Sequence, residues 1–396
     1  MWSPLRIFEN QRSVKLIKHL IIRLLKALSR PRGEPESFLV PAYTGLGNFL
    51  MMTPMVLMLR RLYPQARIFI LAGNHFGTES VFRPGDGIVD EVLWLDEKLP
   101  TWRKVLYFLR LRRARIGTAF IPFDASPSFY WWGILVAGIP RRIGHSFDAL
   151  GVDMGWTRDA LTDDVPLRLD THESDLHFDL LERLHGPFPR TYETHISPVG
   201  AGVLQRFGLR ERGYIAIQVS AANAGVTPKR WREDGFAELI RRLTADGETV
   251  VLPGDRNEKP VIDEFLKRHS LQAVNIAGQT SVDEVSAVIK YARLLVCNDS
   301  GQMHIGNAHG TPLIALYGPT DDVFTAPKAP TSRMIRVPLP CAPCMKNFAR
   351  TEAEALRDCA INVQCMRDIS VEQVYRAARE VLSGTLAKTS QTADQI

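Results

Sequence analysis

The sequence predicts an α/β protein built from two Rossmann-like, doubly wound domains that face each other across a cleft. Short apolar strands alternate with helices in two separate runs, which is typical of parallel sheets covered by helices. A segment rich in Pro and Gly, residues 185–212, lies between the two runs and predicts a linker. The length of 396 residues also exceeds the size at which a single core usually divides.

The predicted organisation has four parts. An amino-terminal helix precedes a first domain and a second domain, and a carboxyl-terminal helix with a tail follows them. The expected bounds of these parts are residues 1–36, 37–190, 205–370 and 371–396.

The composition narrows the classes of function. Hydrophobic residues at 45% and charged residues at 23% exclude a wholly disordered chain and a polytopic membrane protein. A formal net charge of +6 favours an anionic partner, such as a nucleotide, a phosphorylated sugar or an anionic membrane surface. No zinc-finger or RNP pattern points to nucleic acid, so none is expected as a partner.

The amino-terminal part predicts a basic amphipathic helix. Its lysines lie off an apolar stripe with helical spacing, which consists of Ile17, Leu20, Ile21, Leu24 and Leu28. Charges interrupt the apolar run well short of the roughly 20 residues that span a bilayer, and no signal-peptide cleavage site follows. Two interpretations stay open: the helix docks on an anionic membrane face, or it packs against its own domain.

The first domain is predicted from a strand at residues 38–43, the glycine turn "GLGN" and a helix over residues 49–62. The proline in this helix, Pro54, is tolerable only near the first turn. Further strands are expected in "RIFILAG", "EVLWL" and "TAFIPF", with the basic helical segment 102–115 between the last two. Asp124 follows the last of these strands, at the end where parallel sheets bind ligands.

The second domain shows the same alternation. Strands are expected in "YIAIQVS", "ETVVLPG", "RLLVCND" and "PLIALYG". Asp234 is a candidate cap for the helix after the first strand, and Ser281 with Glu284 forms a capping box before a later one.

The stretch "CNDSGQMHIGNAHG" predicts the end of a strand over residues 294–297 and then a helix over residues 302–308. The backbone amides of Ser300 and Gly301 would then be unpaired donors at a helix start, where the helix dipole favours an anion such as a diphosphate. Asp299 would order the loop, and His304 would lie one turn into the helix. The alternative is that Asp299 and Ser300 only cap the helix and that His304 is a surface histidine.

The motif "NDSGQMHIGNAHGTPLIALYGPTD" resembles the signature of glycosyltransferase family 9, the ADP-heptose:lipopolysaccharide heptosyltransferases and their relatives. "GLGNFLMMTPMVLMLRRLYPQARIFIL", "PKRW", "VVLPG" and "IAGQTSVDE" are similar to further family motifs in the expected order. The resemblance covers roughly residues 37–385. It implies a GT-B fold, with the acceptor held by the first domain and a nucleotide-sugar donor held mainly by the second.

The resemblance also implies roles for single residues. Lys229 would contact the donor phosphates and stabilise the leaving diphosphate, with Ser300 and Gly301 in the loop that cradles it. Asp299 and His304 would belong to the same donor site, and Glu258 is a candidate for the ribose hydroxyls. The alternative for Lys229 is an exposed loop lysine.

One position departs from the family pattern. The family commonly has Asp, a candidate general base, where this chain has Asn48. An amide cannot take up the acceptor proton near neutral pH. Asp124 is therefore the candidate base in its place, and Asn48 would hold the acceptor through hydrogen bonds.

Four of the five cysteines predict a second kind of site. Cys297 ends a buried strand, whereas Cys341, Cys344, Cys359 and Cys365 form a set of four thiols within residues 341–365. Because no export signal is recognised, structural zinc or iron is favoured over two disulfides. No cofactor is expected for catalysis, since four thiolates would leave the metal no open position.

Three functions are compatible with these observations. The first is an inverting glycosyltransferase, a peripheral protein at the cytoplasmic face of the inner membrane in lipopolysaccharide biosynthesis. Its donor would be a nucleotide-diphosphate sugar, as in ADP-heptose, and its acceptor a lipid-linked or other glycan. The second is a non-catalytic protein that binds nucleotide sugars or glycans, which Asn48 favours. The third is a redox-sensing or metal-sensing protein built around the cysteines.

Overall fold

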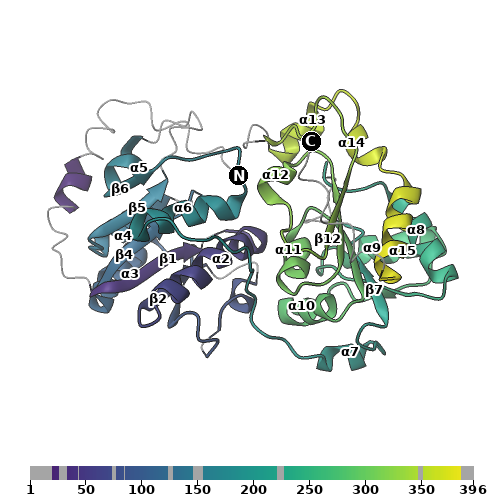
Figure 1. The fold of residues 1–396 in the computed structure, drawn as a ribbon, viewed down its shortest axis with the longest axis horizontal. Helices are drawn as coiled ribbons and strands as arrows, with labels where there is room; N and C mark the ends of the chain where they lie inside the picture. Colours follow the sequence, from purple (N-terminus) through teal and green to yellow (C-terminus); the bar gives the residue numbers. More distant parts are fainter. Residues whose placement is uncertain are drawn as a thin grey trace. The chain divides into compact units, whose positions relative to one another are not determined.

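The computed structural model describes residues 20–25, 34–42, 44–73, 77–83, 85–123, 128–145, 155–220, 227–346 and 351–384. The chain divides into two compact units, Met1–Thr191 and Tyr192–Ile396 (Figure 1). The division falls within the segment 185–212, of which residues 186–200 form neither helix nor strand.

The first unit is built on a parallel sheet of six strands in the order β3-β2-β1-β4-β5-β6. The strands are β1 (Glu34–Ala42), β2 (Arg67–Ala72), β3 (Glu91–Trp94), β4 (Ile116–Ile121), β5 (Arg141–His145) and β6 (Asp163–Val165). The α-helices that connect them are α2 (Leu46–Leu62), α3 (Thr101–Leu111), α4 (Ser128–Val136), α5 (Gly155–Ala160) and α6 (Glu173–His185). The prediction of an α/β unit with a parallel sheet is therefore confirmed.

Helix α2 begins at Leu46, three residues before the predicted start, so Pro54 lies in its interior. A proline there has no N–H for the carbonyl group of Leu50, four residues earlier. The hydroxyl of Thr53 donates a hydrogen bond to that carbonyl at 2.7 Å and supplies a replacement. Buried side chains such as Phe49 and Leu59 hold the helix in the unit, which explains how it tolerates the proline.

A short helical segment, residues 20–25, is the described part of the predicted amino-terminal helix. Ile22 is only 1% exposed and belongs to the same core cluster as Phe108 and Leu111 of α3, with Leu25 packed against that cluster. Leu20 and Leu24, which belong to the predicted apolar stripe, are exposed. The described segment therefore packs on its own unit through Ile22 and Leu25 and leaves Leu20, Ile21 and Leu24 of the predicted stripe exposed.

The second unit repeats the architecture with a parallel sheet in the order β12-β11-β10-β7-β8-β9. The strands are β7 (Tyr214–Ile217), β8 (Thr249–Leu252), β9 (Val274–Asn275), β10 (Leu294–Asn298), β11 (Leu313–Tyr317) and β12 (Ser332–Arg336). The helices are α7 (Gly202–Arg206), α8 (Glu233–Ala245), α9 (Lys259–Arg268), α10 (Val282–Lys290), α11 (Gly301–Ala308), α12 (Asp322–Thr325), α13 (Glu352–Arg357), α14 (Gln364–Arg367) and α15 (Val371–Leu382). Within this unit α8 packs beside α15, and α10 packs beside α11 (Figure 1).

The helix starts in the second unit follow local sequence only in part. The capping box of Ser281 and Glu284 is confirmed at the start of α10. Asp234 lies in the first turn of α8 rather than at its cap, which is Arg232, so that prediction is wrong. An acidic residue in the first turn still stabilises a helix through its dipole, which accounts for the sequence signal.

Among the described residues, we find no helix with the length and apolar character needed to cross a membrane.

Candidate functional site

Each sheet reverses its strand order at one point, between β1 and β4 in the first unit and between β7 and β10 in the second. In doubly wound sheets ligands bind beyond the carboxyl ends of the strands at such a point. The residues that follow these four strands include Asn48, Asp124, Lys229 and the segment 299–304. Of these, the structure describes Asn48, Lys229 and the segment 299–304, and it places them after the strands where ligands are expected, with each unit considered separately.

In the first unit, Asn48 contacts a carboxylate that the sequence did not reveal. The side-chain nitrogen of Asn48, in the first turn of α2, donates to both carboxylate oxygens of Glu173 at 3.0 Å. Glu173 is the first residue of α6, and its side chain is 0% exposed. The amide nitrogen of Asn48 faces Glu173, so the amide oxygen of Asn48 faces the glycine turn. This oxygen lies 3.9 Å from the position that a Cβ atom on Gly45 would take.

The start of α6 is fixed by contacts on both of its sides. The hydroxyl of Ser174 donates to the carbonyl oxygen of Met51 in α2 at 2.7 Å, and the backbone N–H of Ser174 donates to the ring of His172 at 3.1 Å. These bonds hold α6 against α2, so the distance between Asn48 and Glu173 is set by helix packing.

A buried histidine extends this cluster. Nε2 of His177 lies 3.9 Å from a carboxylate oxygen of Glu173, one turn earlier in α6. The His177 ring stacks on Phe123, with centroids 6.1 Å apart and ring planes inclined by 26°. Phe123 follows β4, so the chain after β4 runs past His177. Asp124 itself lies outside the described residues.

In the second unit, the predicted strand ends one residue later than expected and the predicted helix begins one residue earlier. β10 ends at Asn298 and α11 begins at Gly301, with Ser300 at its cap in an extended conformation. The Ser300 hydroxyl makes no capping bond and instead donates to Oε1 of Gln218, beyond β7, at 2.6 Å. A Cβ atom added at Gly301 would meet no described atom within 4 Å, so there is open space next to the first residue of α11.

Lys229 is held by two carboxylates. Its Nζ lies 3.1 Å from Glu352 at the start of α13 and 3.7 Å from Asp299 at the end of β10. Burial lowers the pKa of Lys229, but the carboxylates of Asp299 and Glu352 together raise it by more, so its pKa lies above the ordinary value. Lys229 therefore stays charged near neutral pH while its side chain is 22% exposed.

The segment that carries Lys229 is anchored by a buried asparagine. Oδ1 of Asn298 accepts the backbone N–H of Trp231 at 3.0 Å, and its Nδ2 donates to the carbonyl oxygen of Ser220 at 3.2 Å. Asn298 is 0% exposed, so these bonds are shielded from water. The anchor fixes the chain on both sides of Lys229, and it explains why an asparagine ends this strand.

His304 is buried in the first turn of α11 rather than lying on the surface. Burial lowers the pKa of His304 to about 4, with the Asp299 carboxylate opposing this shift and the Lys229 ammonium adding to it. The imidazole is therefore neutral near neutral pH and adds no charge beside Lys229.

Glu258 lies after β8, the strand next to β7, and is 4% exposed. Its Oε2 accepts the backbone N–H of Asp255 at 2.7 Å. Its Oε1 is buried and has no hydrogen-bond partner among the described residues. Glu258 thus keeps one acceptor that a ligand hydroxyl could use, but its hydrogen bond goes to Asp255 rather than to Lys229 or Asp299.

The four clustered cysteines form no disulfide bond with a described residue. Burial raises the pKa of Cys365 to about 11, and Cys344, Cys359 and Cys341 also act on it, so the four lie within electrostatic range. Cys341 is exposed, and the sulfur of Cys359 accepts the backbone N–H of Val363 at 3.1 Å. In the described part of the chain, no three His, Cys, Asp or Glu side chains are arranged to hold a metal ion. The predicted zinc or iron site is therefore not supported, because neighbouring thiols alone do not make a coordination shell.

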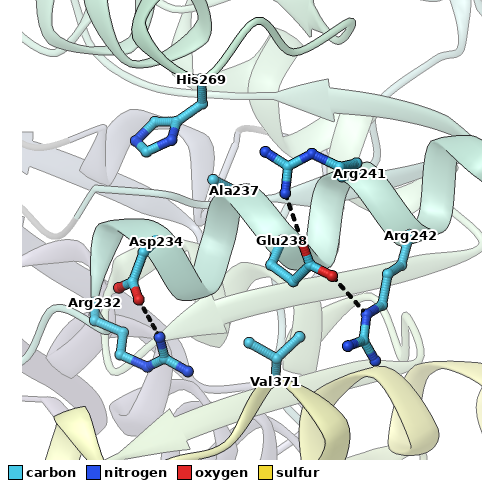
Figure 2. Close-up of a pocket in the computed structure, with 8 residues that line it drawn as sticks. All are labelled: Arg232, Asp234, Ala237, Glu238, Arg241, Arg242, His269 and Val371. Atoms are coloured by element: carbon cyan, nitrogen blue, oxygen red, sulfur yellow. Dashed lines mark hydrogen bonds and ion pairs between the residues drawn. The ribbon is translucent and has the colours of Figure 1, made fainter.

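A separate pocket of about 400 Å³ lies along α8 (Figure 2). Its charged side chains pair with each other: Glu238 contacts Arg241 and Arg242, and Asp234 contacts Arg232. None of the predicted site residues lines it. We therefore place the candidate site at the loops described above.

Solved structures with the same architecture define the class of fold. The structure of Escherichia coli ADP-heptose lps heptosyltransferase II superposes with a TM-score of 0.67 at 23% identity, covering 89% of this chain and 100% of that one. A glycosyltransferase family 9 structure from Veillonella parvula gives a TM-score of 0.69 at 20% identity, covering 90% and 99%. The predicted GT-B fold of two Rossmann-like domains is thereby confirmed.

Sequence comparison gives the family. Residues 186–354 match glycosyltransferase family 9 (heptosyltransferase). Lipopolysaccharide heptosyltransferase 2 of Escherichia coli (strain K12) is 36% identical over 113 residues, 28% of this chain and 32% of the relative. Lipopolysaccharide heptosyltransferase 3 of Escherichia coli is 27% identical over 290 residues, 71% of this chain and 83% of the relative. The chain thus spans about a third of the length of the first curated relatives that it matches.

Sequence reasoning missed several residues of these sites. Glu173, Gln218 and Glu352 contact predicted site residues from distant parts of the chain, and His177 lies next to Glu173. Asn48 and Glu173 are 125 positions apart, and no local motif marks such a pair.

Proposed function

We propose that the chain is an inverting glycosyltransferase that transfers a sugar from a nucleotide-diphosphate donor to a glycan acceptor. The names of its relatives support a heptose as the sugar, ADP-heptose as the donor and lipopolysaccharide as the acceptor. The observation that carries the proposal is Lys229, a cation kept charged by Asp299 and Glu352 in the loop after β7.

Lys229 and the start of α11 suit a diphosphate for the same electrostatic reason. Unpaired backbone amides and the helix dipole favour negative charge at a helix start, and an ammonium group adds a full positive charge. When the glycosidic bond breaks, charge develops on the departing diphosphate, so this arrangement stabilises the transition state more than the ground state. In this proposal Ser300 and Gly301 contact the phosphates, and Asp299 positions Lys229.

The rest of the donor would be held by neighbouring residues. His304, neutral near neutral pH, can donate or accept a hydrogen bond without changing the charge of the phosphate site. Glu258 would accept a ribose hydroxyl at Oε1, the buried oxygen that has no partner among the described residues.

The acceptor would bind at the carboxyl edge of the first sheet. Its hydroxyl oxygen forms a bond to the anomeric carbon while the bond from that carbon to the diphosphate breaks. Asp124 takes the hydroxyl proton, and the nucleoside diphosphate leaves. A single displacement of this kind inverts the anomeric centre.

Asn48 would hold the acceptor hydroxyl in place through its amide oxygen. Glu173 accepts both hydrogen bonds from the amide nitrogen, so it fixes which atom of Asn48 faces the glycine turn. We therefore assign Glu173 a positioning role, which suits a side chain that is 0% exposed.

We also propose that the protein works at the cytoplasmic face of the inner membrane as a peripheral protein. The exposed side chains of Leu20, Ile21 and Leu24 on the amino-terminal helix support a contact with anionic lipid. Point variants test this better than deletion of the helix, because Ile22 is buried in the core of the unit.

The purified protein presented with a panel of nucleotide sugars tests the proposed activity. Thermal shift and release of the nucleoside diphosphate should single out one donor, and transfer to an added acceptor should follow. We expect Lys229→Ala to raise the barrier by about 2–4 kcal/mol, the usual effect of one lost contact to developing charge. Lys267→Ala, at an exposed lysine of α9, is the matched control and should turn over as the wild type does. Wild-type turnover in Lys229→Ala would remove Lys229 from the mechanism.

A non-catalytic nucleotide-sugar binder is the second candidate. The observation that favours it is Asn48, an amide at the position where the family commonly has a carboxylate. This candidate predicts a thermal shift with a nucleotide sugar but no release of the diphosphate with any acceptor, whereas the transferase predicts both.

A further inference from the structure

Helix α3 of the first unit leaves a row of large apolar side chains open to solvent. Trp102, Val105, Leu106 and Leu109 are 59%, 39%, 44% and 41% exposed. Positions spaced by three, four and seven residues lie on one face of a helix. We call this row the α3 face.

The opposite side of α3 is committed to the core. Phe108 and Leu111 are 1% and 9% exposed and belong to the core cluster that also contains Leu39 and Phe69 of the sheet. Tyr107 also packs against this cluster, so the helix is anchored without the α3 face.

The exposed apolar side chains of the described residues are unevenly distributed. Eight of the eleven large ones lie in the first unit, and seven of those belong to α3 or to the helical segment 20–25. Both helices contribute buried residues to one core cluster. A soluble protein exposes single apolar residues routinely, but a row of this kind marks an interaction surface.

The charge of α3 indicates the chemistry of the partner. Residues 101–115 contain six basic residues and no acidic one. Arg103, Arg110 and Arg113 are exposed. The guanidinium of Arg103 lies 5.1 Å from the centroid of the Trp102 ring. Apolar residues and tryptophan on one face with arginines around them are typical of helices that lie in the interface of an anionic bilayer.

We propose that the α3 face docks on an anionic phospholipid surface and forms a second membrane contact beside the amino-terminal helix. This inference rests on the membrane partner in the proposed function, but it requires neither the donor nor the transfer reaction. A second copy of the chain is a poorer occupant, because two α3 faces in contact would bring twelve like charges together.

The topology of the first unit relates the α3 face to the proposed acceptor site. α3 follows β3, so Trp102 in its first turn lies toward the carboxyl edge of the sheet, and α3 then runs back to the start of β4. The first turn of α2, which carries Asn48, follows β1 at the same edge of the sheet. Docking through the Trp102 end of α3 therefore brings the proposed acceptor edge toward the lipid.

Co-sedimentation of the full chain with vesicles tests this inference. The vesicles contain phosphatidylcholine, either alone or mixed with phosphatidylglycerol. We expect Leu106→Ser with Leu109→Ser, and separately Arg110→Glu with Arg113→Glu, to weaken partitioning onto the mixed vesicles at least tenfold. All four positions are exposed, so these variants should keep the wild-type melting temperature.

Three further variants make the test specific. Lys267→Glu with Arg376→Glu makes the same change of charge on the surface of the second unit and should partition as the wild type does. Leu20→Ser with Leu24→Ser measures the amino-terminal helix separately and should lower binding without abolishing it. Lys229→Ala should bind vesicles normally, so a failure of the transferase proposal is distinguishable from a failure of this one.

Two results would overturn the proposal. One is wild-type partitioning in both α3 variants. The other is a change from oligomer to monomer in the apolar variant with unchanged vesicle binding, which would assign the α3 face to a second copy of the chain.

Discussion

Both sheets arrange six parallel strands in one order, with the first three strands of each unit running outward on one side and the last three on the other. At the point of reversal the two units nevertheless carry different side chains. In the second unit Lys229 lies between Asp299 and Glu352 beside the start of α11. In the first unit the amide of Asn48 is bonded to buried Glu173. The fold thus determines where a ligand binds, whereas the side chains determine which ligand it is.

The side chains at the two points of strand reversal differ mainly in their electrostatic properties. Lys229 is partly exposed and stays charged, so its ammonium group can contact a bound anion directly. The Glu173 carboxylate is buried and accepts two bonds from a neutral amide. The second unit is therefore suited to a diphosphate, and the first to a neutral hydroxyl group that must be oriented.

The largest effect is expected from Asp124→Asn in the first unit. A positioned carboxylate that takes a proton typically contributes 10²–10⁴-fold to the rate, so turnover should fall by about that factor. Donor affinity, which belongs to the second unit in this proposal, should stay close to wild type. Steady-state kinetics combined with a donor titration separates the two, and full activity in the variant would rule out Asp124 as the base.

The next largest effect is a pH-dependent change in the stability of the protein, which we assign to His304 in the second unit. Its pKa is lowered from 6.5 to about 4 in the folded chain, so the unfolded chain binds a proton first as the pH falls. The contribution of neutral His304 to stability is therefore complete above pH 6.5 and is lost as the pH falls toward 4.

His304→Gln should remove this dependence. Between pH 7 and pH 4.5 the wild type should lose on the order of 2 kcal/mol more in its free energy of unfolding than the variant does. Urea unfolding of both proteins at the two pH values measures this difference. Equal losses would show that His304 is protonated in the folded protein.

A smaller effect is expected from Glu173→Gln, because Glu173 is assigned to positioning. The variant keeps the shape of the side chain but loses one acceptor, so the amide of Asn48 is held less well. Turnover should fall about tenfold, below the 10²–10⁴-fold typical of a lost base. The pH profile of turnover should keep its acidic limb, whereas loss of that limb would identify Glu173 itself as the base.

The smallest change in activity is expected from Asn48→Asp, which restores the family residue. A carboxylate at this position would lie within hydrogen-bond distance of Glu173, and two such carboxylates cannot both be charged at low cost. We expect no gain in turnover at pH 7, together with a lower melting temperature that recovers as the pH falls. A clear gain would show that the missing carboxylate alone limits the protein.

The sequence predicted those features of the fold and the site that depend on a local pattern of residues. The strand-to-helix change at Ser300 and the loop that carries Lys229 were both recognised from contiguous motifs. The partners Glu173 and Glu352 were not, since each lies more than a hundred positions from the residue that it contacts. Such pairs arise from the packing of α6 on α2 and from the position of α13, which no local motif encodes.

Two other features needed the structure for a different reason. The spacing of Cys341 and Cys344 suggested a metal, but spacing does not determine which way thiols point. The sequence of α3 showed that it is basic and apolar, but it did not show that Phe108 and Leu111 are buried in the core while Trp102 and Leu109 are exposed. Exposure of a helix face depends on its neighbours in the fold.

The most direct test is a calorimetric titration of ADP into the wild type, Lys229→Ala and the control Lys267→Ala. If the second unit holds the diphosphate at Lys229, the wild type and the control should bind alike. Lys229→Ala should bind at least tenfold more weakly, because a hydrogen bond to a charged group contributes about 1.5–3 kcal/mol. Equal affinity in all three proteins would contradict the assignment of the diphosphate to this site.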